Sequence, residues 1–164
     1  MATELANPAA WYASWAWSLP LIVLNVLIHV IGLGLINERV VQALSDGPMS
    51  RRRLMPRFVG AMSVTVVAAT ALHALEGMIW AVAYRSLGAL PDNRSAMLYS
   101  ISAITSFGHA SLFLEDHWKM MGALEALNGM MLFGLTTAFL FAIIQQVWPR
   151  GKTDRSGTTL VASK

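Results

Sequence analysis

The sequence contains no cysteine among its 164 residues. Disulfide bonds, thiolate metal sites and cysteine nucleophiles are therefore excluded, and cysteine usage gives no information on the redox compartment. Charged residues are also scarce, at 13% of the chain, whereas a soluble domain carries about a quarter. Hydrophobic residues make up 55% of the chain and the mean hydropathy is +0.53. This composition predicts a membrane protein.

Sequence patterns typical of enzymes are missing as well. The chain has no paired nucleophile and base, no phosphate-binding loop and no HExxH zinc motif. It also has no internal repeat and no segment with the composition of a soluble domain. We therefore expect no catalytic residues and a protein that is not an enzyme.

Three apolar stretches are candidates for transmembrane helices. They run from about Leu19 to Ile36, from Phe58 to Tyr84 and from Met121 to Trp148. A span needs roughly 20 residues, so the first stretch is short and the other two are ample. Backbone in lipid must satisfy its own hydrogen bonds, so all three should be helical. Residues 149–164 are polar and are predicted to form a disordered tail.

Basic residues are concentrated in two of the segments outside these spans. The first loop carries Arg39, Arg51, Arg52, Arg53 and Arg57. The tail carries Arg150, Lys152, Arg155 and Lys164. Residues 1–18 carry none, so the positive-inside rule places the loop and the tail in the cytoplasm and the N-terminus outside. We interpret the arginine run as this topology signal, and we expect membrane lipid but no nucleic acid as a partner.

The segment between the second and third spans is too long and too apolar for a plain connector. Pro91 supplies turn chemistry, and Asp92 or Asn93 can cap a helix. Apolar residues then recur at helical spacing over Ser95–Thr105, which predicts a helix too short to span. A polar turn with Gly108 follows, and this combination is typical of a re-entrant segment. The predicted fold is an all-α integral membrane protein with three transmembrane helices, a re-entrant pore helix and a filter loop.

The order of these segments resembles the pore module of the two-transmembrane potassium-channel superfamily over residues 73–147. "HALEGMIWAVAYRSLGAL" is similar to the outer helix of bacterial members and "AMLYSISAITSFG" to their pore helix and first filter residues. "HWKMMGALEALNGMMLFGLTTAFLF" is similar to their inner helix. The resemblance implies a homotetramer in a bacterial plasma membrane, with a monovalent cation as the permeant ion and no cofactor. Residues 1–57 then hold an interfacial segment, the first span and the basic loop, and residues 58–148 form the pore module.

In this resemblance the selectivity filter falls on consecutive residues, namely Thr105, Ser106, Phe107, Gly108, His109 and Ala110, followed by Ser111 at the mouth. The family pattern is roughly Thr-Thr-Leu-Gly-Tyr-Gly-Asp, so the last three positions depart from it. Filter carbonyls replace the water shell of a cation, and they point inward only where the backbone accepts positive φ. Gly108 does so freely, whereas Ala110 would cost about 1–2 kcal/mol. We therefore expect a weakly selective cation pore.

Further residues are assigned supporting roles by the same resemblance. Glu115 and Asp116 are expected to supply the negative field of the outer mouth in place of Ser111. Glu76 and Glu125 are expected to support the filter from behind. The expected hydrogen-bond partners of these two carboxyl groups are Ser100, Ser102 and His109. The residues of the inner helix that are expected to line the cavity and form the gate are Asn128, Gly129, Leu132, Gly134 and Thr136.

Three alternatives stay open beside the pore. A metal site at these carboxylates is not favoured, because di-iron helices use Glu-x-x-His, whereas His73 precedes Glu76. His29 and His73 lie near the middle of their spans and could ligate a b-type haem, although polar groups in spans more commonly join helices. A non-conducting accessory membrane subunit is the third alternative.

Overall fold

The computed structural model describes residues 8–45, 51–108 and 111–147. Its elements are α1 (Pro8–Ser45), α2 (Arg51–Ser86), α3 (Asn93–Ile104), the short 3-10 helix η1 (Asp116–Trp118) and α4 (Lys119–Val147). Three segments are long and apolar enough to cross a membrane, namely Pro8–Ala43, Met55–Ser86 and Asp116–Gln145. The described residues contain no strand. The prediction of an all-helical fold is therefore confirmed for the described residues, as is that of three helices long and apolar enough to cross a membrane.

The first helix is about twice as long as the stretch predicted from the sequence. The predicted span, Leu19–Ile36, lies inside α1, which continues through Pro20. Proline is tolerated in membrane helices where neighbouring groups take up the freed backbone bonds. Before Leu19 the added turns include Ser14, which is fully buried and whose hydroxyl donates to the carbonyl of His117 at 3.1 Å. The sequence prediction was too short because polar or charged residues interrupt the apolar run on both sides, among them Ser14 and Ser18 before it and Glu38 and Arg39 after it.

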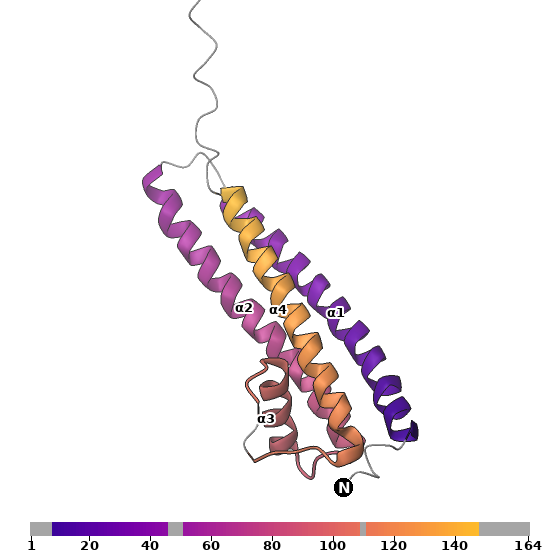
Figure 1. Ribbon diagram of the computed structural model, residues 1–164. Coiled ribbons are helices and arrows are strands. Elements are labelled where there is room, and N and C mark those ends of the chain that lie inside the picture. The colour runs from indigo at the N-terminus through magenta and orange to yellow at the C-terminus, as the bar shows by residue number, and fades with distance from the viewer. Residues whose placement is uncertain (1–7, 46–50, 109–110, 148–164) are drawn as a thin grey trace, which may run out of the picture.

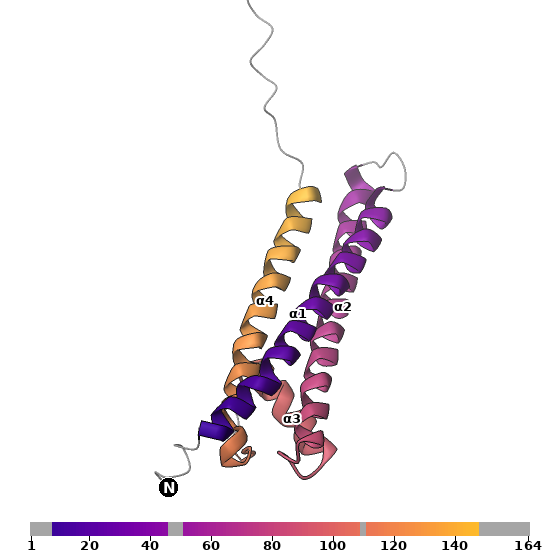
Figure 2. The same cartoon turned by 90° about the vertical axis from the view of Figure 1, so that its right-hand side faces the viewer.

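The three long helices extend along the length of the molecule, and α3 lies at one end (Figure 1). The helices α1 and α4 run in the same direction and α2 runs in the opposite one (Figures 1 and 2). The connections from α2 to α3 and from η1 to α4 lie at the α3 end, together with the start of α1. Contacts of α3 are with α2 and α4. The short helix is therefore held between two long ones.

Glycines allow α3 to pack directly against both neighbours. A Cβ on Gly129 of α4 would collide with the carbonyl group of Ile104, the last residue of α3, and would lie 2.7 Å from its carbon. On α2, a Cβ on Gly77 would lie 2.9 Å from the side chain of Ile101. Gly129 is ten residues into α4, which places the end of α3 about 15 Å along that helix. From there the chain returns to η1, directly before the first residue of α4.

The start of α3 is fixed by Asp92, one of the two capping residues expected from the sequence. Its carboxylate accepts a hydrogen bond from the backbone N–H of Ser95 at 2.9 Å. The hydrogen bonds from the Ser95 backbone and side chain hold the pKa of Asp92 below its ordinary value. The helix therefore begins two residues before the predicted Ser95, at Asn93.

The best-buried part of the protein lies at the α3 end. Trp80, Tyr84, Tyr99, Trp118 and Met121 pack together there. At the opposite end, α1 and α2 line a groove of about 720 Å³ with Arg39 and Arg57 among its lining residues. The outward faces of the long helices carry many exposed apolar side chains, as expected of helices surrounded by lipid.

We predict that Gly129→Ala displaces α3. The added methyl group would meet backbone rather than a flexible side chain, so the overpacking should cost about 1–3 kcal/mol or more. Gly134→Ala on the same helix is the matched control, because a Cβ at Gly134 has nothing within 4 Å. Thermal unfolding in mild detergent measures both variants. Equal stability of the two would contradict the direct contact between α3 and α4.

We also predict that Asp92→Asn makes the cap of α3 independent of pH. The lowered pKa of Asp92 means that its stabilisation is present above the pKa of an unfolded-chain aspartate and is lost as the pH falls through the folded-state value. Asparagine keeps the capping bond but does not titrate. Hydrogen exchange of the α3 amides, compared at each pH, should separate the two proteins only on acidification. A constant difference at all pH values would contradict this account.

Candidate functional site

The predicted filter begins where α3 ends and the chain turns back. Ser106 and Gly108 have positive φ angles, 55° and 83°. The value at Gly108 agrees with the prediction that glycine is needed there, and His109 and Ala110 lie outside the described residues. Thr105 to Gly108 are exposed, with Phe107 at 85%. In a single chain, the described filter residues Thr105 to Gly108 thus lie open on the surface.

The left-handed conformation of Ser106 was not predicted, and it has a local cause. The N–H of Phe107 donates to the carbonyl of Ser102 at 2.9 Å, and the N–H of Ser106 donates to that of Ala103 at 2.9 Å. This pair of bonds is the Schellman motif, in which the residue after the helix cap is left-handed. Glycine usually holds that position, so a serine there gives no sequence signal. Ser106 therefore belongs to the helix end, and the free segment begins at Phe107.

The acidic residues assigned to the outer mouth are exposed and each lies beside a basic side chain. Asp116 forms an ion pair with Lys119, one turn later. Glu115 lies 3.5 Å from Nδ1 of His117. Ser111 is exposed as well. The negative field expected at this end is therefore partly offset by Lys119.

Behind α3 lies a fully buried carboxyl group, that of Glu125. Its Oε1 is 2.5 Å from the hydroxyl of Ser100, and its Oε2 accepts a hydrogen bond from Tyr84 at 2.7 Å. The Ser100 hydroxyl also lies 2.6 Å from the carbonyl oxygen of Gly77. A hydroxyl has one proton to donate, so donation to Gly77 leaves the proton of the Glu125 contact on Glu125. The hydrogen-bond pattern therefore describes a neutral carboxylic acid with both oxygens paired.

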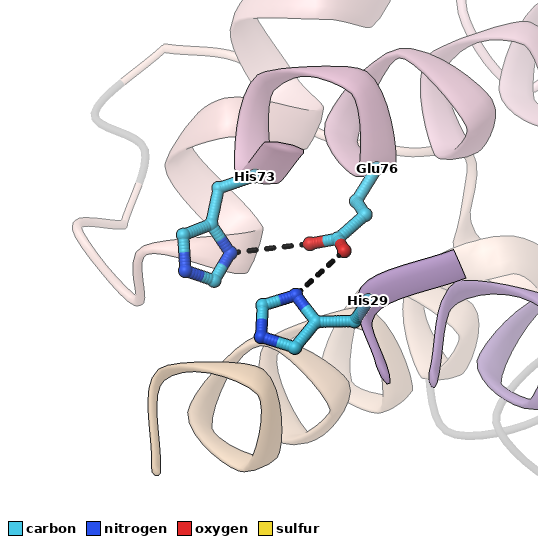
Figure 3. A group of neighbouring side chains, drawn as sticks. All are labelled: His29, His73 and Glu76. Atoms are coloured by element: carbon cyan, nitrogen blue, oxygen red, sulfur yellow. Dashed lines mark hydrogen bonds and ion pairs between the residues drawn. The ribbon is translucent and has the colours of Figure 1, made fainter. Parts of the chain in front are cut away.

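The expected contact between Glu125 and Ser100 is thus confirmed, whereas the one expected for Glu76 is wrong. Glu76 points toward the two histidines (Figure 3). Its Oε1 lies 2.7 Å from Nδ1 of His29, and its Oε2 lies 3.1 Å from Nδ1 of His73. His29 and Glu76 are completely buried and His73 is 9% exposed. Ser102 donates to the carbonyl of Leu98 instead.

Thr136 of α4 joins the same two histidines on their other side. Its hydroxyl oxygen lies 3.0 Å from Nε2 of His29 and 3.2 Å from Nε2 of His73. The neighbouring Thr137 bonds to the carbonyl four residues earlier, in Phe133, and no such bond is found for Thr136. Phe133 also stacks on the His73 ring with centroids 4.3 Å apart. His29, His73, Glu76 and Thr136 thus form a closed ring of hydrogen bonds, here called the histidine ring, that joins α1, α2 and α4.

The sequence contained only part of the signal for this ring. The spacing of His73 and Glu76 places them on one face of a helix, and His29 lies at a similar depth in the first span. Thr136 had been assigned to the cavity, and nothing in the sequence pairs it with the histidines. The meeting of three helices at one level is decided by tertiary packing.

The geometry also bears on metal and haem ligation. A haem iron would have to lie between the imidazoles, but the ring centroids of His29 and His73 are only 5.0 Å apart and each nitrogen already has a partner. His29, His73 and Glu76 do offer ligand atoms within 4.8 Å of one another, and this donor set is one that zinc accepts. A transition metal therefore fits the ring better than a haem.

The inner-helix residues expected to line a cavity divide into two groups. Asn128, Leu132 and Thr136 are buried inside the chain, and Gly129 lies against α3. Gly134 alone of the set is exposed. The face of α4 that carries Asn128 and Thr136 therefore packs against the other helices of the same chain.

We predict that Glu125→Gln preserves the cluster behind α3 and that Glu125→Ala disrupts it. The amide of glutamine can donate to Ser100 and its carbonyl can accept from Tyr84, which reproduces the neutral acid. Alanine leaves the Tyr84 hydroxyl buried and unpaired, at a cost of about 1–3 kcal/mol, and adds a cavity. Thermal unfolding measures the difference. A glutamine variant as unstable as the alanine variant would indicate an ionised carboxylate instead.

Comparison with known proteins found no match of this chain to a family model, a curated protein or a solved structure. The resemblance to the potassium-channel superfamily therefore stays a prediction from the sequence. The roles given above to individual residues are therefore inferred from their contacts in the structure.

Proposed function

We propose that this chain is one subunit of a homotetrameric membrane pore for monovalent cations. The observation that carries the proposal is the position of α3, whose last residue lies against Gly129, well along α4 from its first residue. In the proposed pore, α3 is a re-entrant helix, and the chain that follows it returns to the surface before η1. Non-helical backbone at such a depth is tolerated where it lines a wet cavity or is buried in protein.

The direction of α3 supports passage of a cation. Its C-terminal end is the end that reaches Gly129, and a helix carries partial negative charge at that end. The exposed segment from Phe107 onward follows directly. Carbonyl groups from several subunits are needed to replace the water shell of an ion. A single chain supplies one copy, so four chains around an axis complete the ring.

The exposed side chains of this segment support assembly. Phe107 is 85% exposed and Phe113 is 68% exposed, and neighbouring subunits would cover such large apolar groups. The buried face of α4 that carries Asn128 and Thr136 cannot line a cavity shared between subunits. In the tetramer that role falls to exposed residues of the same helix, Met131, Gly134 and Leu135.

The orientation proposed from the basic residues is compatible with this assembly. The end that bears Arg39 and Arg57 lies opposite α3 and would face the cytoplasm, where anionic lipid headgroups attract arginine. The α3 end and the exposed acids then face outside. Because the residues at positions 109–111 depart from the family pattern, we expect weak discrimination between potassium and sodium.

Reconstitution into potassium-loaded liposomes tests the proposal. We predict cation flux and a mass of four subunits in mild detergent. Gly108→Ala should reduce the flux strongly, because alanine at a φ of 83° is strained by about 1–2 kcal/mol and the filter backbone would shift. The control is Gly88→Ala, since Gly88 has a φ of 71° and equally open space around its Cβ but lies outside the filter loop.

Comparison of the two glycine variants distinguishes a specific effect on the filter from a general loss of stability. Gly88→Ala should carry a similar strain and leave the flux per tetramer unchanged. Equal loss of flux in both variants would contradict a filter at Gly108. A tetramer without any flux would favour the non-conducting accessory subunit, and a stable monomer would overturn the proposal.

A further inference from the structure

The histidine ring does not contribute to the pore proposed above, and its hydrogen bonds define how many protons it holds. The ring has four contacts, two at the Glu76 carboxylate and two at the Thr136 hydroxyl. Each contact needs one proton between its two heavy atoms. Thr136 supplies one of these protons with its own hydroxyl. The remaining three protons must be carried by His29, His73 and Glu76 together.

Three protons on these residues correspond to zero net charge. An ionised Glu76 with two neutral histidines holds only two protons and a charge of −1, and one contact then places two acceptors against each other. A fourth proton gives a charge of +1 and places two donors against each other. Both states leave an unpaired polar contact and an uncompensated charge in a buried site, which is costly.

We propose that His29, His73, Glu76 and Thr136 form a buried proton-binding site that holds three protons and relays one between the two imidazoles through the threonine hydroxyl. In the ionised form, Glu76 accepts from Nδ1–H of both histidines, and one histidine is an imidazolium. This imidazolium donates Nε2–H to the oxygen of Thr136, and the Thr136 hydroxyl donates to Nε2 of the other histidine.

The relay conserves atoms and charge. The Nε2 proton of the imidazolium passes to the Thr136 oxygen while the hydroxyl proton of Thr136 passes to Nε2 of the partner histidine. The positive charge has then moved from α1 to α2, or back, with every contact still paired. Transfer of the imidazolium's own Nδ1 proton to Glu76 gives a further form, with a carboxylic acid and two neutral histidines, that also pairs all four contacts.

Buried polar groups without a hydrogen-bond partner indicate the side from which protons reach the ring. Among the described residues, the side-chain amides of Asn25 and Asn128 and the Nε1 of Trp80 are buried without a hydrogen-bond partner. Asn25 precedes His29 by one helical turn and Trp80 follows Glu76 by one turn, both toward the α3 end. Buried polar groups of this kind are normally satisfied by ordered water. We expect water between these groups and the ring.

On the opposite side the ring is bordered by apolar residues, beyond which the fully buried Thr65 lines the groove that contains Arg39 and Arg57. Leu33 follows His29 by one turn and Ala69 precedes His73 by one turn, and both are buried. Ile143, two turns beyond Thr136, is 1% exposed. The other buried carboxyl group packed near these helices, Glu125, is paired separately with Ser100 and Tyr84. The unpaired polar groups therefore favour proton access from the α3 end.

Nuclear magnetic resonance of histidine and glutamate labelled with ¹⁵N and ¹³C tests the proton count. A His109→Gln, His117→Gln background in lipid nanodiscs leaves only the two histidines of the ring. At neutral pH the protons on four ring nitrogens and on the Glu76 carboxyl group should total three. Glu76→Gln identifies the Glu76 signal, and its amide can close the ring with two neutral histidines. A total of two or four would overturn the proposal.

The relay is tested by a matched pair of variants at Thr136. In the unmodified ring, the ¹⁵N chemical shift of Nε2 in each histidine should be an average of the values for protonated and unprotonated nitrogen. Thr136→Val should abolish this averaging, and Thr136→Ser, which keeps the hydroxyl, should restore it. Averaging that persists in the valine variant would show that the hydroxyl does not carry the proton.

A zinc titration of the unmodified protein tests the competing metal site. We expect no change in the Nδ1 signals at zinc concentrations in modest excess over protein. Displacement of both signals with release of a proton would identify the ring as a metal site and overturn the proposal. The proton count and the zinc titration use the ring without substitution, so they hold even if a Thr136 variant fails to fold. Neither readout depends on ion flux.

Discussion

The contact on which this arrangement of helices depends is the histidine ring. Helices in lipid gain little from packing apolar side chains against one another, because the surrounding acyl chains are equally apolar. Polar contacts that would be unsatisfied in lipid therefore have a large share in holding spans together. His29, Glu76 and Thr136 come from α1, α2 and α4, so one closed set of hydrogen bonds joins all three long helices.

A second contact of a different kind positions α3. Gly129 and Gly77 leave space on the surfaces of α4 and α2, which the backbone of α3 fills at Gly129 and the side chains of Ile101 and Ser100 fill at Gly77. Small residues allow the same close approach between helices in membranes generally. The Schellman motif at Ser106 then ends α3 at a defined residue. The exposed residues Phe107 and Gly108 therefore begin at a defined depth along α4.

The two buried clusters meet on consecutive residues of α2. The carboxylate of Glu76 bonds to the histidines, and the carbonyl of Gly77 accepts a hydrogen bond from Ser100 of α3. Ser100 in turn contacts Glu125 of α4. A change in the hydrogen bonds of Glu76 would therefore act next to the residue that positions α3. This adjacency gives the proposed proton site a short path to the proposed pore, although each can be tested without the other.

The sequence by itself determined the membrane character, the three spans, the short helix between the second and third, and the cap at Asp92. Each of these follows from local composition or spacing, as does the shared face of His73 and Glu76. The full length of α1, the left-handed Ser106, the burial of Asn128 and Leu132, and the closure of the ring at Thr136 were decided by the tertiary structure. All four features have the same physical reason. Each depends on a contact with another helix or on the backbone geometry of a helix end, and the residue type alone reveals neither. Sequence spacing reports which side chains share a face, and only the packing of the helices decides what that face meets.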